Sequence, residues 1–525
     1  ITNANGASYP DVPTDLVCSA SCVNLPSFFD TKRLAVITTQ TSSNGTAWTY
    51  HRQWRLNGSF PDPGDGTNEK LFLLSIVPVQ IASIISPPAT PVELTERTVF
   101  EGVALRNREF VSASIPYSNI FRVSKVTDDL GRKVDVTYQH NGCSPLPYWN
   151  NNVTDCYPRW EGSGWAIYRR WAVDRVVVTD LVGAGTGTGV APPVTYDYTY
   201  GLPGWHWDTM HWWTDPHPVP GDPNTNFPLS YGEFRGYASV TVTVGVGATK
   251  TVTRENFYRG MNGNNGQTVM MARTWTPGPG GDGAPATAYD DDWLAGQVWE
   301  SIQYDGATSN ILTATRNYST WTSTQAGMVP RMRDMSADTI RKWRITLQQS
   351  RLRDNTAAAP VWRDSRVDTS LDALGRVQIT HSTGFVDVPG DEQCARNFYL
   401  NGSAPPASTA SPGWMNLVVQ TATWSSVGVQ PTHSPYAAGA CTGASVAVSR
   451  TFLGGNAISS AGVALDPRAQ SAPASLKPAP TASLTRIKNN SPGTDELDRW
   501  TYTRATYDTA GRMTTSTDAN GVVTT

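Results

Sequence analysis

The stretch Tyr507-Asp508-Thr509-Ala510-Gly511-Arg512 is the part of this 525-residue chain that most clearly indicates its fold. In an Asp-x-x-Gly segment, the aspartate accepts hydrogen bonds from the turn's own backbone, and the glycine adopts the positive φ that closes the turn. A second such segment begins at Asp518 and ends at Gly521. The residues between the two turns, 512–517, have the length of one ordinary strand. The stretch therefore predicts turn, strand, turn, which is one rung of an antiparallel sheet.

The same signature, with arginine after the glycine, occurs twice more in the chain. The two further copies are Asp128, Gly131 and Arg132, and Asp372, Gly375 and Arg376. Three copies in one chain indicate internal repetition. Each copy is followed by a β-type run, with Val134, Val136 and Tyr138 after the first copy and Val377 and Ile379 after the second. The sequence thus predicts a protein built from repeated hairpins.

The composition favours strands and turns over helices and excludes two classes of partner. Only 16% of the residues are charged, 10% are aromatic, and the net charge is -3. This balance gives no general attraction to nucleic acid or to anionic membranes. An apolar run of 18 residues is missing from the sequence, so we expect no membrane-spanning helix. We predict an all-β protein.

The order of elements along the chain divides it into three regions. We expect an irregular N-terminal segment over 1–30, an upstream β region over 31–270, and a repeat-bearing β region over 271–525. The one plausible helix, 337–353, is predicted to be a strand because its apolar residues have a period of two. Segments dense in Pro, Gly, Ala and Ser, at 276–287, 401–414 and 454–480, are expected to be surface loops.

The six cysteines fall into three pairs that are local in sequence. Our hypothesis is three disulfides in an exported protein, Cys18–Cys22, Cys143–Cys156 and Cys394–Cys441. The alternative is buried free thiols in a cytosolic protein. A zinc site is not favoured, because the chain has no Cys-x-x-Cys and the three pairs are far apart in sequence.

A segment rich in tryptophan and histidine allows three interpretations. The tryptophans are Trp205, Trp207, Trp212 and Trp213, and the histidines among them are His206, His211 and His217. A metal site needs ligands that converge on one point, whereas the neighbouring prolines predict an extended loop. Flat aromatic faces suit sugar rings, so a glycan platform is one alternative. We expect instead that the tryptophans pack this loop against the rest of the protein.

The remaining candidates for chemistry are weak. Asp290, Asp291 and Asp292 could hold Ca²⁺ or supply half of a glycosidase pair, but we expect a solvated acidic turn. The glycine-rich segment 183–189 lacks dinucleotide-loop spacing and precedes two prolines that forbid the required helix. The sequence contains no nucleophile elbow and no convincing catalytic triad. We therefore predict no catalytic residue, no metal and no cofactor.

The repeat resembles that of the RHS/YD-repeat proteins, which centres on Tyr-Asp-x-x-Gly-Arg and a strand ending in Asp-x-x-Gly. Only Tyr507 supplies the tyrosine; the other two copies have Thr127 and Leu371. Further segments look like those of large actinobacterial RHS proteins, and their order also fits. These segments are 54–66, 156–158, 232–237, 258–263 and 293–296.

The resemblance implies a long antiparallel β-hairpin ribbon coiled into a hollow shell, as in RHS toxins, toxin-complex B and C components and teneurins. It implies a non-catalytic wall, secreted or at the surface of a bacterium of actinobacterial type. The shell would enclose and help deliver a toxin or other cargo, the protein's own C-terminal segment beyond residue 525. Two alternatives stay open. One is a cell-surface adhesin that binds a target-cell glycan or protein, and the other is a glycan-active hydrolase that uses buried carboxylates.

Overall fold

The chain folds into two compact units. Unit 1 comprises Ile1–Arg254 and Asp305–Ser309, and unit 2 comprises Glu255–Tyr304 and Asn310–Thr525. The computed structural model describes residues 11, 32–42, 45–80, 92–93, 97–109, 116–143, 152–160, 165–182, 191–206, 231–275, 287–306, 309–323, 329–330, 337–338, 341–354, 361–372, 375–388, 390–400, 417–426, 441, 445–454, 456–460, 463–470, 480–486, 500–508 and 511–525.

The described residues of unit 1 form strands and one short 3-10 turn, η4 (Gly247–Thr249). The strands are β1 (Val36–Thr41), β2 (Thr49–Ser59), β3 (Phe72–Gln80), β4 (Val92–Glu93), β5 (Thr98–Arg108), β6 (Ser118–Thr127), β7 (Arg132–Gln139), β8 (Cys156–Trp160), β9 (Trp165–Arg169), β10 (Ala172–Asp180), β11 (Val194–Tyr200), β12 (Pro203–His206), β13 (Glu233–Tyr237) and β14 (Ser239–Val244). The next strand, β15 (Thr251–Phe257), contains one boundary between the units, and a second boundary lies before Asp305, the last residue of β18 (Val298–Asp305).

Unit 2 is built in the same way, with 3-10 turns η5 (Asn264–Gly266), η6 (Asp292–Leu294) and η8 (Pro467–Ala469). Its strands are β16 (Met270–Ala272), β17 (Thr287–Tyr289), β18 (Val298–Asp305), β19 (Ile311–Ser323), β20 (Val329–Pro330), β21 (Ala337–Asp338), β22 (Arg341–Asp354), β23 (Val361–Leu371), β24 (Val377–Phe385), β25 (Glu392–Tyr399), β26 (Val418–Ser426), β27 (Ala447–Leu453), β28 (Ser459–Ser460), β29 (Val463–Ala464), β30 (Pro480–Arg486), β31 (Trp500–Tyr507), β32 (Met513–Thr517) and β33 (Val523–Thr524).

The long strands of unit 1 pair antiparallel in chain order. The sequence of neighbours is β1, β2, β3, β5, β6, β7, β10, β11 and β14. Two small hairpins are inserted into the connections: β8–β9 between β7 and β10, and β12–β13 between β11 and β14. The unit is therefore a meander, in which each inner strand has both of its edges paired.

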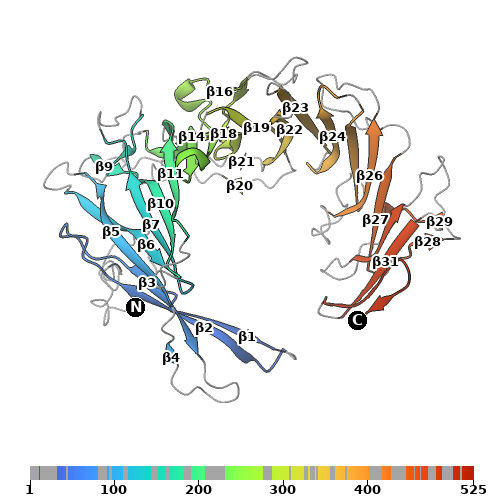
Figure 1. Cartoon of the computed structure of the whole chain (residues 1–525), viewed down its shortest axis with the longest axis horizontal. Helices are drawn as coiled ribbons and strands as arrows, with labels where there is room; N and C mark the ends of the chain where they lie inside the picture. The colour runs from blue at the N-terminus through green and yellow to red at the C-terminus, as the bar shows by residue number, and fades with distance from the viewer. Residues whose placement is uncertain are drawn as a thin grey trace. The chain divides into compact units, whose positions relative to one another are not determined.

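Unit 2 repeats this plan over a longer run. Its neighbours are β18, β19, β22, β23, β24, β25, β26, β27, β30, β31, β32 and β33, and every pair is antiparallel. Figure 1 shows β22, β23 and β24 following one another along this ribbon. Small hairpins β20–β21 and β28–β29 are again inserted between long strands. The all-β fold class and the antiparallel hairpin ribbon predicted from the sequence are confirmed.

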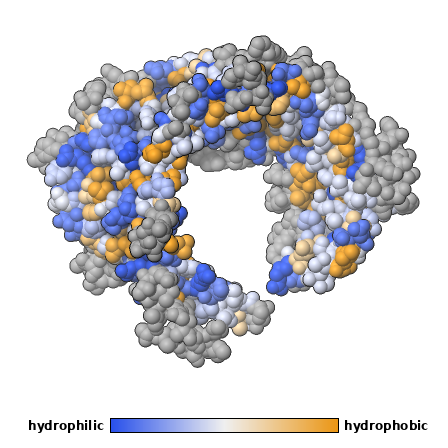
Figure 2. Space-filling view, viewed as in Figure 1, coloured by the Kyte–Doolittle hydropathy of each residue, from blue (hydrophilic) through white to orange (hydrophobic). Residues whose placement is uncertain are grey.

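The apolar core is distributed among small clusters. In unit 2, the largest cluster gathers Phe452, Leu484 and Trp500 with smaller apolar residues, and a second joins Tyr258, Trp299 and Tyr318. The visible face carries small apolar areas interspersed with polar residues (Figure 2). Among the described residues, no helix has the length and apolarity needed to span a bilayer.

The segment that could have been a helix, 337–353, instead contains β21 and most of β22, as its period of two predicts. The expectation of a surface loop over 454–480 is wrong for part of that segment. It forms β28, β29 and η8, and its Ile458 and Ala464 are buried in the largest core cluster. Small apolar residues scattered among Gly, Ser and Pro are enough to fold this insert back onto the sheet.

Candidate functional site

The described residues of the three Asp-x-x-Gly-Arg segments share one pattern of backbone hydrogen bonds, and each segment joins two consecutive strands. They connect β6 to β7, β23 to β24 and β31 to β32. In each copy the aspartate N–H donates to the carbonyl of the arginine at 2.9 Å, and the glycine N–H donates back to the aspartate carbonyl. The glycines have φ of 82°, 68° and 79°, the left-handed region that glycine adopts without strain. The segment that begins at Asp518 closes in the same way.

The aspartate side chain completes the turn by holding the arginine. In the second copy, Asp372 Oδ1 accepts from the Arg376 N–H at 2.9 Å, and Oδ2 accepts from Arg376 Nε at 2.7 Å. The other two copies make both contacts at 2.7–2.9 Å. The sequence predicted the roles of the aspartate and glycine but missed that of the arginine. The signal was its fixed place, four residues after the aspartate.

The three copies differ in how far they are buried. The Arg376 and Asp372 side chains are each 3% exposed, whereas the arginines of the first and third copies are 65% and 79% exposed. Burial acts to raise the pKa of Asp128 in the first copy. Hydrogen bonds from the backbone of Arg132 and Leu130 and from the Arg132 side chain outweigh that effect and hold this pKa below its ordinary value.

A buried ion pair forms the centre of a polar network in unit 2. Arg316 Nε donates to Glu300 Oε1 at 2.7 Å, and neither side chain is exposed. The remaining groups have partners too: Arg316 donates to Gln349 and to the Trp275 carbonyl, and Glu300 accepts from Thr274. Because each charge has a partner of opposite sign, the pair links β18, β19 and, through Gln349, β22 without leaving a buried charge unpaired. No sequence motif marks residues that are 16 positions apart.

Two of the three expected disulfides lie in the described part of the chain, and both are present. Cys143 pairs with Cys156 in unit 1, and Cys394 pairs with Cys441 in unit 2. Cys18 and Cys22 lie outside the described residues.

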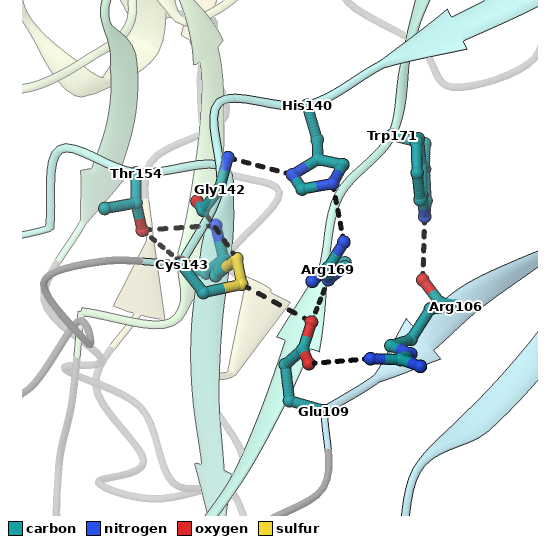
Figure 3. A network of polar contacts seen from close by, with 9 residues as sticks. Arg106, Glu109, His140, Gly142, Cys143, Thr154, Arg169 and Trp171 are labelled. Atoms are coloured by element: carbon teal, nitrogen blue, oxygen red, sulfur yellow. Dashed lines mark hydrogen bonds and ion pairs between the residues drawn. A yellow bond between two sulfur atoms is a disulfide. The ribbon is translucent and has the colours of Figure 1, made fainter.

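The first disulfide adjoins a polar network at the ends of β5, β7 and β9 (Figure 3). Glu109 accepts from Arg169 and lies 3.6 Å from Arg106. The Sγ of disulfide-bonded Cys143 lies 4.0 Å from Glu109 Oε1. His140, just after β7, accepts on Nδ1 from the Gly142 N–H at 2.8 Å. The network and the disulfide thus fix the junction of these strands.

His140 is held in its neutral form by this environment. Burial lowers its pKa from the ordinary value, and the nearby Asp155 carboxylate offsets this only in part. Its ring packs edge-on against Trp171 at 4.5 Å between centroids, and the Trp171 indole donates to the Arg106 carbonyl at 2.7 Å. The arrangement suits structural support of the strand junction.

Of the four tryptophans in the tryptophan-rich segment, the structure describes Trp205, and this residue packs inside the protein as expected. Trp205 is 2% exposed, its indole N–H donates to the Thr154 carbonyl at 2.8 Å, and its ring packs against Tyr157 and Phe234. Trp205 is therefore a core residue of unit 1 and presents no open face to a sugar. Trp207, Trp212 and Trp213, with His211 and His217, lie outside the described residues, as does the glycine-rich segment 183–189.

The expectation of a solvated acidic turn at residues 290–292 is wrong for Asp290. This side chain is fully buried, and its Oδ1 accepts from the N–H groups of Arg259 and Gly260 at 2.7 and 2.8 Å. Asp291 accepts from the Asn262 side chain at 2.7 Å. Asp290 and Asp291 thus organise the loop before η5. Within the described residues, no group of three or more His, Cys, Asp or Glu is placed to hold a metal ion.

Comparisons with known proteins find matches among solved structures. No protein-family model and no curated protein sequence matches the chain. Among solved structures, it is similar to a chain of TcdB2-TccC3-TEV, with a TM-score of 0.44, 12% identity, and coverage of 90% of this chain and 26% of that one. It is also similar to a chain of the Photorhabdus luminescens Tc holotoxin pore, with a TM-score of 0.43, 10% identity, and coverage of 92% and 27%. The chain spans about a quarter of the length of these structures.

Proposed function

We propose that this chain is a non-catalytic wall segment of a secreted β-shell, which encloses a polypeptide cargo and helps to deliver it. The cargo is the C-terminal toxin or other segment that the RHS/YD resemblance implies. In this role the function follows from the geometry of the wall, because a continuous wall separates an unfolded or toxic polypeptide from its surroundings until delivery.

The repeat turns carry the proposal. Three turns with one pattern of backbone hydrogen bonds each close a hairpin between consecutive strands, two of them in unit 2 and one in unit 1. A meander of such hairpins can be extended by repetition, since every added hairpin pairs its edge with the previous one. Small inserted hairpins and small core clusters are compatible with a thin wall, whose strands have two separate faces.

The buried carboxylates support a structural role over hydrolysis. Within the described residues, the buried acidic side chains are Asp155, Asp290, Glu300, Asp368, Asp372 and Glu392. Each accepts a hydrogen bond from the protein itself: Asp155 from Tyr237 and Asn141, for example, and Asp368 from Arg366. A glycosidase needs two carboxyls that face a cleft with room for a sugar and a water. These carboxylates instead hold neighbouring segments of the fold.

Two disulfides support secretion, because such bonds persist in oxidising compartments. Protease protection tests the enclosure itself. A protease recognition sequence is placed in the cargo of the full-length native protein, and the same cargo is also prepared alone as the control. We expect rapid cleavage of the isolated cargo and protection within the native protein until it is denatured. Equal cleavage rates in the two preparations would rule out enclosure.

A further inference from the structure

A cavity of about 160 Å³ in unit 2 is rich in arginine. Its lining comes from three separate segments: the second repeat turn with the start of β24, the end of β25, and η8. The side chains that matter are Arg376, Arg396, Phe398 and Arg468. No pattern in the sequence predicts this cavity, because its segments are separated along the chain.

Two of the three arginines already have carboxylate partners. Arg376 is paired with Asp372 inside the repeat turn and lies over the Tyr399 ring, 4.1 Å from its centroid. Arg468 donates from Nε to both carboxylate oxygens of Asp466, at 2.9 and 2.7 Å. These two guanidinium groups are therefore neutralised by the protein.

The third arginine, Arg396, lacks such compensation. Among the described residues, no carboxylate forms an ion pair with it, and its Nε is buried without a hydrogen-bond partner. A buried donor without an acceptor is costly, more so on a charged group. The guanidinium lies 5.0 Å from the centroid of the Phe398 ring, and that of Arg468 lies 5.1 Å from the same ring. Cation–π contacts of this kind hold guanidinium groups in place without using their N–H donors.

We propose that this cavity binds a single oxyanion, a carboxylate or a phosphate group, with Arg396 as its main contact. Three arginines against the carboxylates of Asp372 and Asp466 leave one net positive charge, which one anion would balance. A guanidinium is the side chain best suited to this ligand, because its planar donors match two oxygens at once. The site does not depend on the proposed cargo, so it can exist whether or not the chain encloses one.

Calorimetric titration of this chain with inorganic phosphate, and separately with acetate at equal ionic strength, tests the site. We expect saturable binding of at least one of them, weakened at least tenfold in Arg396→Gln. Arg512→Gln, which removes an exposed repeat-turn arginine just before β32, is the control and should bind as the wild type does. The anion that binds identifies the ligand as phosphoryl or carboxylate.

A second variant keeps the test decisive if Arg396→Gln does not fold. Arg468 is 48% exposed, so Arg468→Gln should fold, yet it removes one positive charge from the cavity and leaves Asp466 unpaired. We expect it to weaken binding several-fold. Binding of neither anion to the wild type would overturn the proposal, as would binding that both Arg396→Gln and Arg468→Gln leave unchanged.

Discussion

Arg376 donates to Asp372 at 2.7 Å with both side chains 3% exposed, whereas the equivalent Arg512 donates to Asp508 at the same distance while 79% exposed. One sequence motif thus forms one geometry in two environments. The buried copy also contributes a wall of the arginine-rich cavity. Environment, rather than contact distance, should therefore decide what each pair contributes to stability.

This difference predicts unequal effects of the same substitution in unit 2. Asp372→Ala should lower the free energy of unfolding by about 3–5 kcal/mol, because it leaves the buried Arg376 without its counter-charge. Asp508→Ala should lower it by about 1 kcal/mol, because Arg512 stays hydrated and only exposed hydrogen bonds are lost. Urea denaturation of the two variants measures the contrast. Equal losses would show that burial of the second turn has no energetic effect.

The Glu300–Arg316 pair predicts a second large effect. Glu300→Gln should lower the free energy of unfolding by about 3–5 kcal/mol, since Arg316 would remain charged and buried. The matched control is Glu101→Gln, which breaks the pair with Lys125 in unit 1. These two side chains are 56% and 35% exposed, so this variant should lose far less stability than Glu300→Gln. Denaturant titration of both variants measures the two free energies of unfolding. A Glu300→Gln protein as stable as the control would contradict the assignment of this pair as a buried structural centre.

His381 predicts a loss of stability in mild acid. Burial lowers its pKa below the ordinary 6.5, against the attraction of Asp368 and Glu392 and with the repulsion of Arg366. The unfolded state therefore binds the proton more readily than the folded state. The contribution of neutral His381 to the free energy of unfolding is complete above about pH 6.5 and is lost as the pH falls through the lowered pKa of the folded state.

The measurement compares the free energy of unfolding at about pH 7.5 and about pH 5. The fall between these values should be smaller in His381→Gln than in the wild type. An unchanged pH dependence would contradict the buried, neutral state of this histidine. His140 has a pKa lowered in the same direction in unit 1, so some acid sensitivity should persist in the variant.

The two disulfides predict that their four cysteines resist alkylation and that reduction lowers the free energy of unfolding. Without reductant, mass spectrometry after alkylation should find Cys143, Cys156, Cys394 and Cys441 unmodified. Loops closed over 13 and 47 residues should contribute about 3 and about 4 kcal/mol in the chain-entropy account. Alkylation of all six cysteines in the native, unreduced protein would overturn both the bonds and the argument for secretion. The same experiment tests the proposed Cys18–Cys22 bond.

Local rules predicted much of this fold. The period of two predicted the strand that is β22, and Asp-x-x-Gly predicted the turns, because both signals depend only on neighbours in sequence. The cysteine pairs could be proposed for a similar reason, since each joins positions close along the chain.

Long-range polar contacts could not be predicted in this way. Glu300 and Arg316 are ordinary charged residues in sequence, and only the register of β18 against β19 places them opposite each other. The prediction for Asp290 is wrong because an acidic triplet usually faces water, whereas the folded loop turns this side chain inward onto two backbone N–H groups. The cavity at Arg396 needs three segments to meet, so it exists only in the folded protein.

Electron cryo-microscopy of the full-length native protein tests the enclosing wall most directly. We predict a coiled β wall with weak, disordered density inside it, as expected of an unfolded cargo. An empty or open wall, with ordered sugar or partner density on its outer surface, would contradict enclosure and favour a role in adhesion.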